Sequence, residues 1–159
     1  MHDFNKSIDV MAEDFYKAYK RCKRGENPQK MLNSCVTKYD ALNVPAIVMA
    51  SFAIELFLKS ILSKERKGEK IFGHDFVSLF SLLSTKSQNY IKMNVSKLLY
   101  GTDSFDDALQ GINNAFCFWR YIHEKEDFGY GLNKTLMVLP AFMETIRNLS
   151  KSLLSDTDV

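Results

Sequence analysis

The sequence predicts an all-α fold, with about five helices in a single domain. Apolar residues recur at steps of three and four along most of the chain, which is the period of an amphipathic helix. Only seven Gly and three Pro interrupt 159 residues, and no stretch alternates as a half-buried strand would. A chain of this length can bury a substantial core. We therefore expect a single helical domain over residues 1–155 and a frayed tail over residues 156–159.

The first predicted helix covers residues 4–23 and ends in a basic stretch. Its apolar positions follow helical spacing: Ile8, Met11, Phe15 and Tyr19. The cations at its end are Lys20, Arg21, Lys23 and Arg24. Cations in a last turn complement the C-terminal carbonyls, and the following Gly25 accepts a left-handed cap, so the stretch fits an ordinary helix stop. The same four side chains also fit a basic patch for phosphates, and the sequence leaves both interpretations open.

A second helix is predicted over residues 44–62, with Asn43 as its cap. Nearly every position in it is apolar, which predicts a helix buried at the centre of the fold. Because charges interrupt it, a membrane span is not expected. Ser51, Glu55 and Lys59 recur every four residues and form one polar line along the helix. The line either faces a cleft, a partner or a second subunit, or is a simple intrahelical pair of Glu55 and Lys59 at the surface.

Shorter helices and a long last helix are predicted in the rest of the chain. They cover residues 76–83, about 87–100, and 103–124, and the last begins near Lys134 and kinks near Pro140. Asp75 or His74 serves as the N-cap of the first of these, and Ser104 lies in the capping segment of the third. Charged residues 64–70 and residues 126–133 are predicted to be connecting loops.

Composition and spacing exclude several classes of function. The net charge of +2 does not by itself indicate a nucleic-acid binder. Three Cys without a Cys-x-x-Cys pair favour a reducing, cytoplasmic compartment over a disulfide framework or zinc knuckle. His2, His74 and His123 lie far apart in sequence, so neither a metal site nor a cofactor is expected. The sequence also lacks a Gly-rich phosphate loop, a dinucleotide fingerprint and a nucleophile elbow.

The strongest candidate site lies near the end of the helix predicted over residues 103–124. Arg120, His123 and Glu124 share one helical face, because residues three and four apart are neighbours. Trp119, the only Trp of the chain, lies beside them and is expected to point toward the core. A guanidinium, an imidazole and a carboxylate in one cleft can bind phosphate or move protons, or they can form a buried network that fixes helix packing.

Several of these motifs, taken in their order along the chain, resemble a known family. The run from Ser51 to Leu62 is followed by a charged loop, by Gly73-His74-Asp75-Phe76 and by Leu79-Phe80 and Leu82-Leu83. This pattern resembles the second and third helices of HEPN domains, and Phe118-Trp119-Arg120-Tyr121 with Glu124 resembles a fourth-helix segment of some HEPN-like proteins. The resemblance implies an up-and-down, HEPN-like helical bundle, frequent dimerisation and a role in toxin-antitoxin, phage-defence or RNA-processing systems.

The resemblance also implies a catalytic Arg and His, but their spacing in this sequence differs from that of the family. Catalytic HEPN ribonucleases carry an Arg and a His separated by four to six residues and act without metal. Here only Tyr121 and Ile122 separate Arg120 from His123. The resemblance implies that Arg120 and His123 are the catalytic pair of an endoribonuclease. Arg120 would stabilise the phosphate charge, and His123 would transfer the proton.

Two classes of function follow from the sequence. In the first, a HEPN-like homodimer binds RNA or a nucleotide through Arg120 and the stretch from Lys20 to Arg24, with metal-independent cleavage of RNA as an extension. In the second, the domain is a non-catalytic dimerisation or interaction module, with an antitoxin or defence-system protein as a partner. Its internal network would comprise Glu55, Lys59, Arg120 and Glu124, with Glu55, or alternatively the nearby Glu124, as the carboxylate paired to Arg120. The homodimer is expected to use the face of Trp119 or the polar line.

Overall fold

The computed structural model describes residues 4–24, 43–99, 104–113 and 132–155, and all structural statements below concern these residues. They form six helices and no strand, which confirms the all-α prediction with one helix more than the approximate number expected. The helices are α1 (Phe4–Arg24), α3 (Asn43–Glu65), α4 (Phe76–Ser81), α5 (Thr85–Ser96), α6 (Phe105–Ile112) and α8 (Leu132–Ser155).

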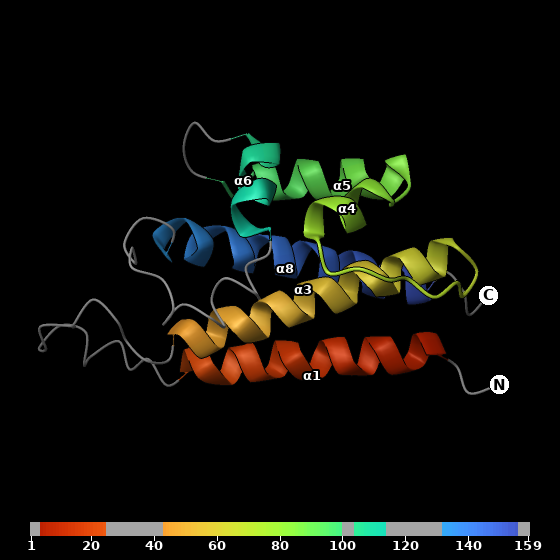
Figure 1. The fold of residues 1–159 in the computed structure, drawn as a ribbon, viewed down its shortest axis with the longest axis horizontal. Coiled ribbons are helices and arrows are strands. Elements are labelled where there is room, and N and C mark those ends of the chain that lie inside the picture. Colours follow the sequence, from red (N-terminus) through yellow and green to blue (C-terminus); the bar gives the residue numbers. More distant parts are fainter. Residues whose placement is uncertain (1–3, 25–42, 100–103, 114–131, 156–159) are drawn as a thin grey trace, which may run out of the picture.

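The long helices α1, α3 and α8 lie side by side, and the short helices α4, α5 and α6 cover α3 and α8 (Figure 1). Helix α1 runs antiparallel to α3 and α8, which run in the same direction. Side-chain contacts fix this register, because Ser60 of α3 lies between Asp9 of α1 and Ser150 of α8. The short helices form a second layer on one side of the long helices. No described helix covers the opposite face of the α1–α3 pair.

Helix α3 is the central helix, as its apolar sequence predicts. It contacts both α1 and α8, and Ile54, Leu58 and Ile61 are fully buried in the core. Burial of each such side chain stabilises the fold by roughly 1.5–3 kcal/mol. Its segment Pro45–Glu65 is the one described helix long and apolar enough to cross a membrane, and 72% of that window is buried inside the bundle. Burial of this kind is typical of a core helix.

The short helices begin where the sequence supplies capping residues. Asp75 caps α4, since its Oδ1 accepts a hydrogen bond from the backbone N–H of Ser78 at 2.6 Å. Ser104 caps α6 by accepting from the N–H of Asp107, as the sequence indicates. Helix α5 begins at Thr85, two residues earlier than expected, because Ser84 caps it.

Several predicted helix ends are wrong. Helix α3 continues to Glu65 instead of ending at residue 62, and α4 ends at Ser81 instead of residue 83. Helix α5 ends at Ser96 instead of continuing to residue 100. Helix α6 ends at Ile112, so the helix predicted over residues 103–124 is not continuous. Asn113 leaves the helical conformation with φ −58° and ψ 139°, and its side chain binds Asp75 and the backbone of α4 instead. Tertiary hydrogen bonds of this kind override the local helical pattern.

Candidate functional site

The polar line of α3 contains a buried ion pair. Lys59 Nζ lies 2.8 Å from Glu55 Oε1, and the two side chains are only 14% and 8% exposed. The pair is therefore not the solvated surface pair that was one of the two alternatives. Ser51, the third member of the line, donates to the carbonyl of Ile47 in its own helix at 2.8 Å. The network thus centres on Glu55 and Lys59.

His74 joins this pair from the loop that follows α3. Its Nδ1 lies 2.9 Å from the same Glu55 Oε1, while its side chain is 77% exposed. We call Glu55, Lys59 and His74 the histidine group. The carboxylate thus holds the imidazole at Nδ1, while most of the ring is exposed to solvent. When the ring proton is on Nδ1, Nε2 is free to accept a proton, which is the arrangement that a general base requires.

The position of His74 is fixed by the residues that follow it. Asn113 Nδ2 donates to Asp75 Oδ2 at 2.6 Å, and Asn113 Oδ1 accepts from the N–H of Phe76 at 2.8 Å. Hydrogen bonds from Ser78 and Asn113 lower the pKa of Asp75 below its usual value, which keeps the carboxylate charged. Asn113 therefore connects the end of α6 to the start of α4, directly beside the histidine group.

The strongest candidate of the sequence lies outside the described residues. Arg120, His123 and Glu124 belong to residues 114–131, so their proposed roles stay predictions. The same holds for the expected pair of Arg120 and Glu55. In the described residues Glu55 Oε1 already has two nitrogen partners, Lys59 Nζ and His74 Nδ1.

The basic residues at the end of α1 point in different directions. Lys20 Nζ lies 2.9 Å from Glu144 Oε1 and 5.3 Å from the ring centre of Tyr16. Its hydrogen bond to Glu144 raises the pKa of Lys20, so this charge is already matched by α8. Arg21 is exposed, and Lys23 is half-buried between helices. The side chain of Arg24 lies outside the described part. A phosphate-binding role for the four residues stays a prediction.

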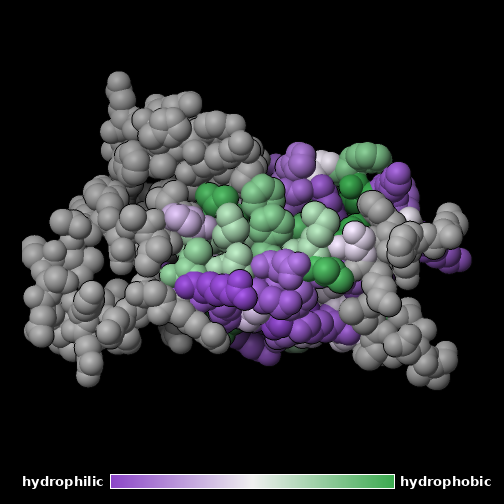
Figure 2. All heavy atoms as spheres, turned by 90° about the horizontal axis from the view of Figure 1, so that it is seen from below, coloured by the Kyte–Doolittle hydropathy of each residue, from purple (hydrophilic) through white to green (hydrophobic). Residues whose placement is uncertain are grey.

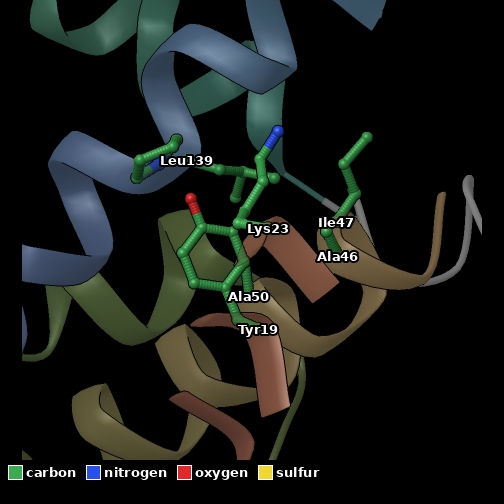
Figure 3. Close-up of a pocket in the computed structure, with 7 residues that line it drawn as sticks. Tyr19, Lys23, Ala46, Ile47, Ala50 and Leu139 are labelled. Atoms are coloured by element: carbon green, nitrogen blue, oxygen red, sulfur yellow. The ribbon is translucent and has the colours of Figure 1, made fainter. Parts of the chain in front are cut away.

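Lys23 also lines a small pocket at this end of the bundle. The pocket lies between α1, α3 and α8, with Tyr19 directed toward α8 (Figure 3). Its lining is formed by Tyr19, Lys23, Ala46, Ile47, Ala50, Leu139 and Pro140. Its cavity volume is about 10 Å³, which is far smaller than the roughly 300–1,000 Å³ of most small-molecule sites. This mostly apolar pocket is not the candidate site.

A second polar group is buried among the three long helices. Lys64 Nζ lies 3.0 Å from Asp9 Oδ1, 3.0 Å from the carbonyl of Ser150 and 3.1 Å from Ser150 Oγ. Ser60 Oγ donates to Asp9 Oδ1 as well. We call Asp9, Ser60, Lys64 and Ser150 the buried polar cluster. Ser60 and Ser150 are at most 1% exposed, so no substrate can reach them and the cluster fixes helix packing.

Helices α1 and α8 are joined by a further set of ionic contacts. Arg147 binds Glu13 through two nitrogens at 2.7 and 3.0 Å, and its guanidinium lies 3.9 Å from the ring centre of Tyr16. Burial raises the pKa of Glu13, but Arg147 and Lys151 offset this, and the pKa is lowered overall. These contacts hold the helices together and leave the histidine group as the candidate site.

Comparison with known proteins does not extend this description. No family model, curated protein or solved structure matches the chain significantly. Within the described residues, no group of three or more His, Cys, Asp or Glu side chains is arranged to hold a metal ion. The fold and the site define a helical domain with one carboxylate-anchored, exposed histidine. The sequence did not assign His74 to a candidate site, because no local pattern connects it to Glu55, 19 residues earlier.

Proposed function

We propose that this chain is a HEPN-like helical domain that binds RNA and cleaves it without metal, as a cytoplasmic homodimer in a toxin-antitoxin or phage-defence setting. The observation that supports this best is His74, an exposed imidazole anchored by the buried carboxylate of Glu55 at 2.9 Å. Exposed imidazoles with one nitrogen fixed are suited to proton transfer near neutral pH.

The proposed reaction is an internal transesterification. His74 Nε2 accepts the proton of a ribose 2′-hydroxyl, the 2′-oxygen bonds to phosphorus, and the bond from phosphorus to the 5′-oxygen breaks. The leaving oxygen takes a proton from an acid, for which the family resemblance suggests His123. The products are a 2′,3′-cyclic phosphate and a 5′-hydroxyl. Arg120 and the basic end of α1 supply phosphate contacts in this proposal.

The test uses the purified chain, a mixed pool of RNA and a chelator, with both binding and 2′,3′-cyclic phosphate ends measured. The His74→Ala and His123→Ala variants are each expected to lose cleavage and keep their helical content. Asn89→Ala, an exposed change on α5, is the control and is expected to act like wild type. Full cleavage by His74→Ala excludes His74 as the base, and absence of RNA binding by the wild-type chain refutes the proposed function.

A second candidate function is homodimerisation as a non-catalytic module, and a specific surface favours it. The face shown in Figure 2 carries apolar side chains bordered by hydrophilic ones. On α1 and α3, Phe15 stacks on Phe52 with ring centres 4.8 Å apart, Met11 is 49% exposed, and Val48 and Leu56 are only partly buried. Isolated apolar side chains are common on surfaces, but contiguous ones mark interfaces.

This surface replaces the polar line as the dimer face within the described residues, because Glu55 and Lys59 are paired inside one subunit. The expected result is a dimer that Met11→Lys converts to a monomer, measured as mass in sedimentation. Asn89→Lys, which adds the same charge at an exposed position of α5 away from this surface, is the control. A wild-type monomer across a broad micromolar range would exclude the homodimer.

A further inference from the structure

Phe72 is the most exposed of the large hydrophobic side chains described, at 82%. It lies in the segment between α3 and the cap of α4, which we call the α3–α4 loop (residues 66–74). A fully exposed Phe contributes nothing to the core and keeps an apolar ring in water. A single exposed apolar side chain is common on protein surfaces, so the role of Phe72 has to be argued from the residues beside it in the loop.

The loop that carries Phe72 is anchored on both sides of it. Before it, Ile71 packs against the core, and Ser63 Oγ donates to the carbonyl of Glu69 at 3.2 Å. After it, His74 is held by Glu55. Gly73 has φ +96°, a conformation that residues with a side chain rarely adopt. Phe72 is therefore held outward by anchored neighbours, and its ring needs little ordering before it binds a partner.

The loop that carries Phe72 is rich in cations. It contains Arg66, Lys67 and Lys70 and one carboxylate, Glu69, whose Oε2 lies 3.8 Å from Arg66 Nη1. Next to Phe72 along the chain are Gly73 and His74, whose imidazole is 77% exposed. An exposed aromatic ring on a basic loop is typical of sites for single-stranded nucleic acid, in which bases stack and phosphates meet positive charge.

We propose that the α3–α4 loop is the platform for single-stranded RNA, with one unpaired base stacked on Phe72. Lys67 and Lys70 contact the backbone, and the linkage next to the stacked base is presented to His74. This inference rests on the proposed RNA-binding function and adds its substrate class. Duplex RNA is excluded from the stack, because its bases are already paired and stacked on one another.

The experiment measures fluorescence anisotropy of labelled single-stranded RNA and of the same sequence as a duplex. Phe72→Ala is expected to weaken single-strand binding about tenfold, since stacking on one aromatic ring contributes roughly 1–3 kcal/mol per base. Phe72→Trp is expected to restore binding because it keeps an aromatic face. Met93→Ala removes another exposed apolar side chain, 56% exposed on α5, and is the matched control.

The salt dependence of RNA affinity separates the contribution of base stacking from that of the charged side chains. Phe72→Ala is expected to leave the slope of affinity against salt unchanged, whereas the double variant Lys67→Gln, Lys70→Gln is expected to reduce it. Wild-type binding that Phe72→Ala does not alter overturns the inference and leaves the proposed function standing. Absence of any RNA binding by the wild-type chain refutes both. Loss of dimer mass in Phe72→Ala with unchanged RNA affinity would assign Phe72 to a protein contact and overturn the inference.

Discussion

The buried polar cluster and the histidine group both pair a lysine of α3 with a carboxylate, but they differ in what lies beyond the pair. Lys64 and Asp9 are enclosed by three helices, with side chains 8% and 15% exposed. In the histidine group the buried Glu55–Lys59 pair ends in an imidazole that is 77% exposed. A lysine–carboxylate pair therefore has a structural role where helices enclose it completely. The same kind of pair can take part in function where an attached side chain is exposed to water.

The largest effect is expected in the buried polar cluster. Lys64→Ala should reduce the free energy of unfolding by roughly 3–5 kcal/mol, because it leaves the carboxylate of Asp9 buried without its cation. Lys17→Ala is the control: it removes an ion pair with Asp14 whose side chains are 61% and 66% exposed, and it should cost less than about 1 kcal/mol. Urea unfolding measures both. Equal losses would show that the cluster is not a buried network.

A smaller loss of stability is expected in the histidine group. The loss should differ between its buried residue Lys59 and its exposed residue His74. Lys59→Ala should cost roughly 1–3 kcal/mol, since Glu55 loses a charged partner in a nearly buried position. His74→Ala should cost less than about 1 kcal/mol, because an exposed side chain contributes little to stability. Chemical denaturation of the two variants measures the difference. A larger loss for His74→Ala than for Lys59→Ala would assign His74 a structural role.

The smallest effect concerns pH. The pKa of Asp75 is lowered by its hydrogen bonds to Ser78 and Asn113, so ionised Asp75 stabilises the folded state above its unfolded value, near 3.8. That contribution is lost as pH falls through the lower folded-state value. Asp75→Asn should therefore lower stability near neutral pH and flatten the acid end of the stability curve, because Asn still caps the helix but carries no charge and cannot accept at both oxygen positions from Ser78 and Asn113. Thermal unfolding at pH 3 and pH 7 measures this.

Much of the helical layout follows from the sequence because helices are local structures. Spacing of apolar residues identified α1 and the central helix α3, and Asp75 and Ser104 cap the helices that they were expected to cap. The end of α6 could not be found in this way. Asn113 ends that helix because it bonds to Asp75 and Phe76, about 38 residues earlier in the chain.

The sequence by itself determined the all-α class and the central position of α3, since each depends on a helical period within one segment. Only the tertiary structure decided between the alternatives for Glu55: it pairs with Lys59 in a nearly buried position, and His74 shares its carboxylate. It also decided that Asp9 reaches Lys64, 55 residues away, and that Lys20 is matched by Glu144. These contacts depend on the register in which helices pack, and register is set by the whole core at once, so no local pattern encodes it.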